Sequence, residues 1–351
     1  MSNLALYRKY RPKSFNEVVG QDHIVKVLEK SIEGGNISHA YLFVGSRGTG
    51  KTSLARIFAT DLKISPNDIY EIDAASNRGI EDIRELRDGV RTLPFDSKYK
   101  IYIIDEVHML SKDAWGALLK TLEEPPAHVI FILATTELHK VPDTIISRCQ
   151  VFNFYKPTDA ILKSHIIKVA KDEGFALEKG ADELIAILGD GSFRDTLSIL
   201  DKVLNHYQKG NSKKEISITL AEVEEITNAP KRVLVNSILE SLVLSDLDKG
   251  LSIIAKANLE NFDMQLFMKL ILQKFRMLVI LRYAPKQEEV MKGDLSTDDL
   301  DFLRDLIKKD TKAIFRSKAL ATLLESYANL NNAFISSLPL ELALIKIIKE
   351  E

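Results

Sequence analysis

Eight consecutive residues, 45–52, have the types and spacing that hold a phosphate group. They read Gly-Ser-Arg-Gly-Thr-Gly-Lys-Thr and match the pattern G-x-x-x-x-G-K-[ST] in full. Glycines let such a loop curl until its backbone N–H groups point at phosphate oxygens, while the lysine reaches the terminal phosphates and the last hydroxyl binds Mg²⁺. The residues predicted to bind a nucleotide are Gly45, Ser46, Arg47, Gly48, Thr49, Gly50, Lys51 and Thr52.

Two carboxylates that follow another apolar segment are suited to hydrolysis. Asp105 and Glu106 come directly after the run Ile101 to Ile104. A carboxylate at the first position holds Mg²⁺, directly or through water, and one at the second polarises an attacking water as general base. A phosphate loop alone also fits a kinase or a switch GTPase. Small-molecule kinases do not need the second carboxylate, so the pair favours water as the phosphoryl acceptor.

The segments around these residues predict a layered α/β domain. An apolar run at 41–44 precedes the loop, a helix-like stretch at 51–62 follows it, and a further apolar run covers 129–133. Short apolar runs separated by helical stretches are typical of a parallel sheet with helices on both faces. A helix that begins at the loop also points its positive end at the bound anion.

After Pro157 the sequence changes character and predicts helices. Residues 158–173 and 180–188 have helical patterns, and we expect no strand beyond this point. The polar segment 209–214 is typical of a linker. From about Thr219 onward, apolar residues recur at steps of three and four, as on the buried face of a helix.

Composition limits the class of protein. The chain has 351 residues, so we expect two or three domains, and its net charge of -2 gives no overall field that would draw it onto nucleic acid. The one cysteine, Cys149, excludes an internal disulfide and a cysteine zinc site, which fits a cytoplasmic location. Residues 1–12 lack the apolar core of a signal peptide. The most apolar stretch, 275–284, is interrupted by Arg276 and Arg282 and is shorter than the roughly 20 residues of a membrane helix.

Several longer strings narrow the class further. They are Tyr7 to Pro12, Val18 to Gln21, His39 to Phe43, Asp105 to Leu110, Leu118 to Pro126, Ala134 to Thr136, Ser147 to Cys149 and Gly191 to Asp195. Together they closely resemble the gamma/tau subunits of bacterial DNA polymerase III clamp loaders, which are AAA+ ATPases. The resemblance is dense from residue 4 to about 155 and weaker in the helical carboxyl-terminal third.

This resemblance implies a fold and a set of ligands. The expected fold is an α/β P-loop AAA+ domain in residues 1–156, a small α-helical lid domain in 157–214 and an α-helical collar domain in 215–351. The expected ligands are ATP and Mg²⁺, with Thr52 and Asp105 holding the metal. Val18 and Val19 match positions that line the adenine site in the family, although apolar core is an alternative for both.

The same resemblance assigns three residues to hydrolysis. Thr135 matches the sensor-1 position, which orients the attacking water or contacts the γ-phosphate. Arg148 matches the arginine finger, which reaches the nucleotide of a neighbouring subunit, and Arg194 matches sensor 2, which contacts the bound phosphates. The expected catalytic residues are therefore Lys51, Glu106, Thr135, Arg148 and Arg194.

The family also implies partners. These are other clamp-loader subunits of the delta and delta-prime types, further copies of this chain, the sliding clamp and primer–template DNA, with no membrane. Arg78 and Lys112 lie near predicted helix starts and are candidates for DNA phosphate contacts, with solvated surface as the alternative. The interval 61–70 lacks the four-cysteine zinc module of most relatives, so we expect no zinc. The length fits either a gamma-length product or a truncated tau form.

Three other functions stay open from the sequence. A branch-migration helicase shares the ATPase core, but we expect it to lack the Leu-Glu-Glu-Pro-Pro and Ser-Arg-Cys strings and the helical collar. A structural clamp-loader subunit of the delta-prime type usually has a degraded phosphate loop, whereas this loop is intact. The third alternative is a small-molecule kinase.

Overall fold

The computed structural model places the chain in two folded units. One contains residues 1–165 and 189–198, and the other contains 166–188 and 199–351. The structure describes residues 4–76, 86, 88–207, 216–288 and 297–349. The predicted linker 209–214 lies outside these residues, and the predicted division at 156 and 214 into three domains stays a prediction.

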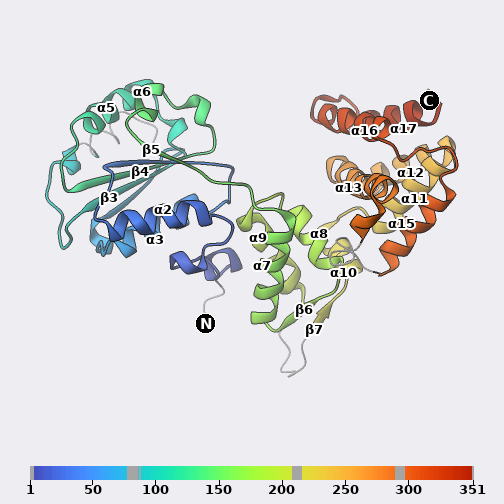
Figure 1. Cartoon of the computed structure of the whole chain (residues 1–351), viewed down its shortest axis with the longest axis horizontal. Coiled ribbons are helices and arrows are strands. Elements are labelled where there is room, and N and C mark those ends of the chain that lie inside the picture. The colour runs from blue at the N-terminus through green and yellow to red at the C-terminus, as the bar shows by residue number, and fades with distance from the viewer. Residues whose placement is uncertain (1–3, 77–85, 87, 208–215, 289–296, 350–351) are drawn as a thin grey trace. The chain divides into compact units, whose positions relative to one another are not determined.

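Five parallel strands form the centre of the first unit (Figure 1). They are β1 (Ala40–Val44), β2 (Ile69–Asp73), β3 (Lys100–Asp105), β4 (Val129–Thr135) and β5 (Gln150–Asn153). Their order across the sheet is β2-β3-β4-β1-β5. Strand β4 therefore lies between β1, which leads into the phosphate loop, and β3, which ends in Asp105. Ligands of open parallel sheets bind outside the carboxyl ends of such strands.

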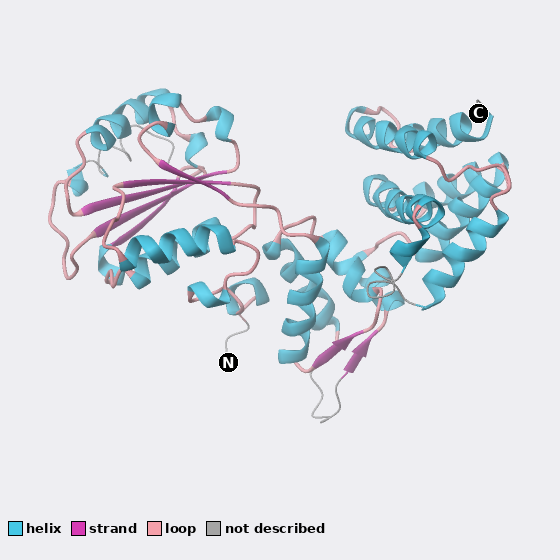
Figure 2. Ribbon diagram, viewed as in Figure 1, coloured by secondary structure: helices cyan, strands magenta, loops and turns pink. Residues whose placement is uncertain are grey.

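Alternating side chains of the central strands serve both faces of the sheet. Tyr41 and Phe43 pack in the cluster that includes α2 (Asp22–Glu33) and α3 (Lys51–Asp61). Ala40 and Leu42 pack in the cluster on the opposite face, with α5 (Lys112–Glu123). Figure 2 shows these helices above and below the sheet, which confirms the predicted layers. The remaining elements assigned to this region are α1 (Leu6–Lys9), η1 (Phe15–Glu17), η2 (Pro66–Asp68), η3 (Val107–Met109), η4 (Leu138–Lys140) and α6 (Asp143–Ile146).

The two edge strands carry too little apolar character to stand out in the sequence. Only the three central strands correspond to the apolar runs, since a central strand is buried on both faces. In β2, Tyr70 is exposed, and in β5, Val151 is exposed. An edge strand with alternating or mostly polar residues gives a weak signal, which explains why β2 and β5 were not predicted.

The second unit is mainly helical, but the expectation of no strand after Pro157 is wrong. Strands β6 (Phe175–Leu177) and β7 (Ile216–Ile218) pair in parallel as a separate two-stranded sheet. Each has three residues, which is too short for a period of two to be read from sequence. Helices α7 (Asp159–Asp172) and α9 (Phe193–His206) contribute residues to both units.

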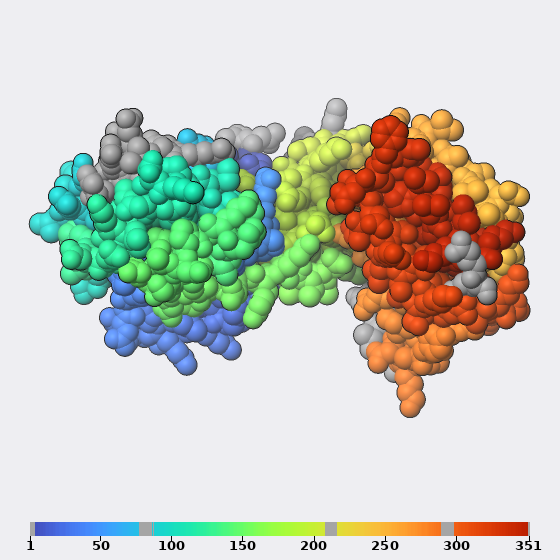
Figure 3. Space-filling model, turned by 90° about the horizontal axis from the view of Figure 1, so that it is seen from above, coloured from blue at the N-terminus to red at the C-terminus, as the bar shows by residue number. Residues whose placement is uncertain are grey.

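Six helices build the largest hydrophobic core of the second unit. They are α11 (Arg232–Val243), α12 (Leu247–Leu259), α13 (Met264–Tyr283), α15 (Thr297–Lys309), α16 (Ser317–Asn329) and α17 (Leu338–Lys349). Phe267 and Phe275 on α13 are fully buried, and Phe275 packs edge-on against Phe315 with ring centroids 5.2 Å apart. The unit also contains α8 (Ala181–Leu188), α10 (Leu220–Thr227), η5 (Pro285–Gln287) and η6 (Leu330–Asn332). In Figure 3, the orange and red segments whose buried side chains form this core make up one continuous surface.

Helix α13 has no membrane-spanning character despite its length. Lys274 on this helix is mostly buried, with its side chain 18% exposed, and its amino group donates to Asp299 at 2.9 Å and to Asn236 at 2.8 Å. Burial lowers the pKa of Lys274, and the charge of Asp299 opposes that shift. Within the described parts of the chain, no helix is long and apolar enough to cross a membrane.

A buried carboxylate holds the segment that leads into β3. Asp68 at the end of η2 is fully buried, and it accepts hydrogen bonds from the backbone N–H groups of Phe95 at 2.5 Å and Asp96 at 3.0 Å. Burial opposes its ionisation, but these N–H groups and Ser97 outweigh burial and lower the pKa of Asp68. The ionised form is therefore the one that the fold stabilises.

We expect Asp68→Asn to lower the free energy of unfolding at pH 7 by about 1–3 kcal/mol, because a neutral amide leaves one buried N–H poorly paired. Since the folded pKa of Asp68 is depressed, the advantage of the natural chain is present above the unfolded pKa. It is lost as pH falls through the folded value. Urea unfolding at several pH values measures this, with exposed Asp61→Asn as control. Equal stability of both variants at pH 7 would contradict the assignment.

Candidate nucleotide site

The phosphate loop joins the carboxyl end of β1 to the start of α3, as predicted. Gly50 caps α3 with φ of 102° and Gly48 has φ of 73°, so both lie in the left-handed region that favours glycine. A Cβ placed on Gly48 would approach the Ser192 hydroxyl to 1.9 Å. The backbone N–H of Phe193 also donates to the Gly48 carbonyl at 3.0 Å. The start of α9 is thus packed directly on the loop.

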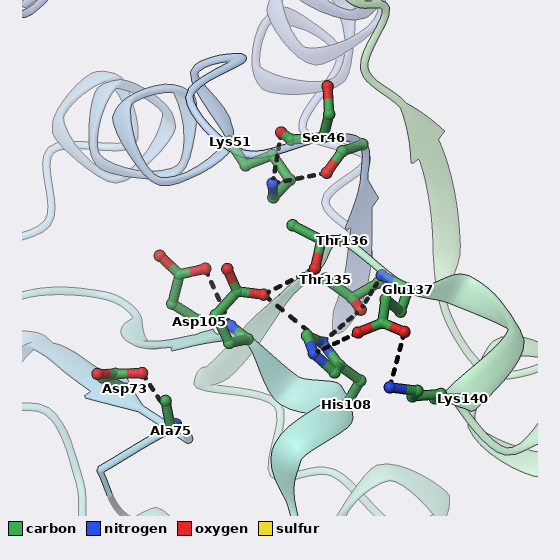
Figure 4. Close-up of polar contacts among 12 residues, drawn as sticks. Ser46, Lys51, Asp73, Ala75, Asp105, His108, Thr135, Thr136, Glu137 and Lys140 are labelled. Carbon is green, nitrogen blue, oxygen red and sulfur yellow. Dashed lines mark hydrogen bonds and ion pairs between the residues drawn. The ribbon is translucent and has the colours of Figure 1, made fainter. Parts of the chain in front are cut away.

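Lys51 is folded over its own loop. Its amino group donates to the carbonyl oxygens of Gly45 at 2.8 Å and Ser46 at 3.0 Å (Figure 4). The residue is only 6% exposed, and burial lowers its pKa, while the carboxylates of Asp105 and Glu106 oppose that shift. The amino group is therefore desolvated and directed at the loop interior, where a phosphate would sit.

The other loop residues differ in exposure. Thr49 is buried and its hydroxyl donates to the Ser46 carbonyl at 2.9 Å, which tightens the turn. Arg47 and Ser46 are exposed on the outer side of the loop. The backbone of the loop, rather than these two side chains, is suited to bind phosphate.

The two predicted metal ligands lie next to each other. The Thr52 hydroxyl donates to Asp105 Oδ2 at 2.6 Å, so one oxygen from α3 meets one from β3. Oxygen donors of this kind fit Mg²⁺, which keeps several waters and is held by one or two protein ligands together with substrate phosphates. Across the described ranges, no group of three or more His, Cys, Asp or Glu side chains is arranged to hold a metal ion.

Glu106 lies beside the end of β4. Its backbone is left-handed, with φ of 49° and ψ of 42°, and its N–H donates to Asp105 Oδ1 at 2.9 Å. The Thr136 hydroxyl donates to Glu106 Oε2 at 3.2 Å. Thr135 is fully buried, and its hydroxyl oxygen accepts the N–H of Glu137 at 3.0 Å. Figure 4 shows Thr135 and Thr136 on the same side of the site as Asp105, below Lys51 in the view.

Arg194 reaches the loop region from the first turn of α9. Its guanidinium lies 5.3 Å from the ring centroid of Tyr7, a cation–π distance. Its neighbour Phe193 is the residue hydrogen-bonded to the Gly48 carbonyl. Arg194 and the phosphate loop therefore belong to one local assembly within the first unit.

Arg148 has its partners on the α5 and α6 side of the unit. Its guanidinium donates to Glu123 Oε1 at 2.9 Å, to the Thr144 carbonyl at 2.7 Å and to the Ser147 hydroxyl at 3.3 Å. The side chain is 34% exposed. Burial raises the pKa of the adjacent Cys149 thiol to about 12, so this cysteine is unreactive at neutral pH.

The remaining predicted contact residues are less sharply placed. Val18 is half-buried and packs against the core cluster of α2 and α3, whereas Val19 is 42% exposed. Their roles at an adenine base stay predictions. Lys112 is exposed at the start of α5, and Arg78 lies outside the described residues.

Two residues of the site were quoted in the sequence strings without a role. Arg11 donates from Nε to the Ser53 hydroxyl at 2.8 Å, one residue after the metal ligand of the loop. Burial lowers the pKa of Arg11, and Arg56 adds to that shift. The other residue is His108, which contacts Thr135. Both residues lie within the family-like strings of the sequence, Arg11 in Tyr7 to Pro12 and His108 in Asp105 to Leu110. A charged or imidazole side chain in such a string is the signal that could have identified them.

The comparisons with known proteins agree with this architecture. The family described as DNA polymerase III, delta subunit, matches residues 20–73 and 63–158. The family described as DNA polymerase III clamp loader subunit, ATPase lid domain, matches residues 162–208. The solved structure of Thermotoga maritima RuvB, a Holliday junction branch migration motor, has a TM-score of 0.52 at 24% identity, covering 67% of this chain and 79% of that one. The fold and the phosphate loop together define an AAA+ protein.

Curated sequences identify the family within that class. Bacillus subtilis DNA polymerase III subunit tau is 40% identical over 315 residues, which cover 83% of this chain and 54% of that protein. Mycoplasma pneumoniae DNA polymerase III subunit gamma/tau is 40% identical over 280 residues, which cover 74% of this chain and 40% of that protein. The chain belongs to the gamma/tau family of bacterial DNA polymerase III subunits. It spans about half the length of these relatives.

We expect Gly48→Ala to weaken ATP binding by about tenfold or more. A left-handed alanine costs about 1–2 kcal/mol, and its Cβ would also push the loop away from Ser192. Titration with a fluorescent ATP analogue measures the affinity. Gly116→Ala is the control, because its Cβ would meet nothing within 4 Å on helix α5. Unchanged ATP affinity in Gly48→Ala would show that binding does not need the close contact between Gly48 and Ser192.

Proposed function

We propose that this chain is an ATPase motor subunit of the bacterial DNA polymerase III clamp loader, which uses ATP to open the sliding clamp and load it onto primer–template DNA. The observation that carries the proposal is the assembly of Lys51, Thr52 and Asp105 beside Glu106 at the carboxyl ends of β1 and β3. Family membership supports the same function.

Each side chain has a step that its position supports. Lys51 leaves the carbonyls of Gly45 and Ser46 and binds phosphate oxygens in their place. Thr52 and Asp105 would hold Mg²⁺, which would supply charge neutralisation at the phosphates when bound. Glu106 accepts a proton as water attacks the γ-phosphorus, the bond to the β–γ bridging oxygen breaks, and ADP leaves with that electron pair. Thr135, at the end of β4, orients the water.

The two arginines complete the charge balance. Arg194 contributes from the same chain, because it lies in the first turn of α9, the helix that packs on Gly48. Arg148 would act on the nucleotide of a neighbouring subunit, which requires it to leave Glu123 and the Thr144 carbonyl. An arginine in this role is worth about 10³–10⁵ in turnover in other phosphoryl-transfer systems. The site of one chain is thus half of a functional unit.

The proposal includes partners and place of action. ATP sites shared between chains require further copies of this subunit or the delta and delta-prime types next to it. The assembly would act on the clamp and on primed DNA in the cytoplasm. A small-molecule kinase would transfer phosphate without DNA or clamp, so stimulation of phosphate release by clamp and primed DNA separates the two functions.

We expect Lys51→Ala to reduce ATP hydrolysis by the assembled complex at least about 100-fold, since a desolvated cation facing the phosphates is lost. Phosphate release measures the rate. Exposed Lys63→Ala is the control and should leave the rate within about twofold. Full activity in Lys51→Ala would refute the site.

We expect Arg148→Ala to keep ATP affinity within about threefold but to lower turnover of the assembled complex by about 10³-fold. Mixing Arg148→Ala chains with Lys51→Ala chains should restore part of the activity, because an intact loop then meets an intact arginine from its neighbour. Exposed Arg91→Ala is the control. If mixing restores nothing while each variant still assembles, Arg148 does not act between chains.

A further inference from the structure

His108 lies between the end of β3 and the end of β4 and has no role in the mechanism above. It is part of η3, and its side chain is only 5% exposed. Its Nδ1 lies 3.0 Å from the Thr135 hydroxyl oxygen and 3.5 Å from Glu106 Oε2. Its Nε2 lies 3.3 Å from Glu137 Oε1. Figure 4 shows the ring next to Thr135 and Glu137.

The surroundings of Glu137 fix what Nε2 meets. Lys140 lies 2.7 Å from Glu137 and His139 lies 3.6 Å from it. The hydrogen bond from Lys140 lowers the pKa of Glu137, and His108 contributes in the same direction. Glu137 is therefore an ionised acceptor at neutral pH, and a hydrogen atom on His108 Nε2 points at it.

The proton of the Thr135 hydroxyl then has a defined direction. The oxygen already accepts the N–H of Glu137 at 3.0 Å. When His108 carries its proton on Nε2, its Nδ1 is an acceptor and the Thr135 O–H donates to it. When Nδ1 is protonated instead, it donates to Thr135 or Glu106, and the Thr135 O–H is free to donate elsewhere. The protonation of the His108 ring thus controls where the Thr135 hydroxyl donates its proton. The same ring lies 3.5 Å from the Glu106 carboxylate.

We propose that His108 is a positioning residue for hydrolysis, which fixes the direction of the Thr135 hydroxyl beside the general base Glu106. The inference rests on the proposed roles of Glu106 and Thr135. Packing alone would need only a flat side chain at this place. The polar contacts go instead to the two groups that would orient and deprotonate the attacking water.

Two amide substitutions separate the two nitrogens of the ring. The amide of asparagine reaches the place of Nδ1, and the amide of glutamine reaches the place of Nε2. We expect His108→Ala to lower kcat for ATP by about 10–100-fold in the full chain assembled with its clamp-loader partners, with KM within about threefold. His108→Asn should regain most of kcat, and His108→Gln should stay near the alanine value. His206→Asn, at an exposed histidine on α9 that contacts none of these groups, should match the natural chain.

The reverse order, with glutamine rescuing better than asparagine, would overturn the proposal, as would equal rescue, no rescue by asparagine, or an alanine variant within about twofold of the natural kcat. A loss confined to KM would do the same. In the double variant with Thr135→Ala, replacing His108 should cost less than about threefold more, and a fully additive loss counts against coupling. Binding of a fluorescent ATP analogue and thermal melting show whether each variant is folded.

Glu106→Gln distinguishes failure of this inference from failure of the proposed function. If Glu106→Gln abolishes hydrolysis while the His108 variants are fully active, the inference alone fails. If Glu106→Gln keeps full activity, the general base assigned in the proposed function is wrong, and the inference falls with it.

Discussion

Parallel pairing of β3, β4 and β1 is the constraint on which the site depends. In the ladder, Val44 lies opposite Thr135 and Ile104 lies opposite Leu133, so the three strands end at one level. Because parallel strands present their carboxyl ends on the same edge, the phosphate loop, the acidic pair and the threonine arrive together. The hydrogen bond from Thr52 to Asp105 then joins the loop helix to β3 across that edge. A shift in register would separate all of these groups.

The sequence predicted the parts of the fold that carry strong local patterns. The central strands are apolar on both faces, and the loop has a fixed spacing, so both were found. The edge strands β2 and β5 were missed because their exposed faces are polar or mixed, and β6 and β7 because three residues are too few to show a period. Tertiary packing decides such segments, and a single sequence does not contain it in readable form.

The residues of the site also fall into those that the sequence predicted and those that only the structure revealed. Lys51, Thr52, Asp105 and Glu106 follow from motif spacing, and the structure brings them together. The contact of His108 with Thr135 joins two residues that are 27 positions apart in sequence, one just after β3 and one at the end of β4. The approach of Arg11 to Ser53 spans 42 residues. Sheet register sets the first contact, and the path of the chain after α1 sets the second. The spacing of residues along the sequence therefore does not reveal either contact.

The hydrogen bonds from Lys51 to its own loop affect how a nucleotide would bind. The amino group has already left water during folding and is bound to two carbonyls of its own loop. An incoming nucleotide therefore exchanges one set of contacts for another and does not have to dehydrate an ammonium ion on arrival. Ionic strength screens a buried charge less than an exposed one, so the contact of Lys51 with phosphate would depend less on salt than an exposed contact does. Phosphate oxygens would replace the carbonyl oxygens of Gly45 and Ser46 as acceptors for the Lys51 amino group.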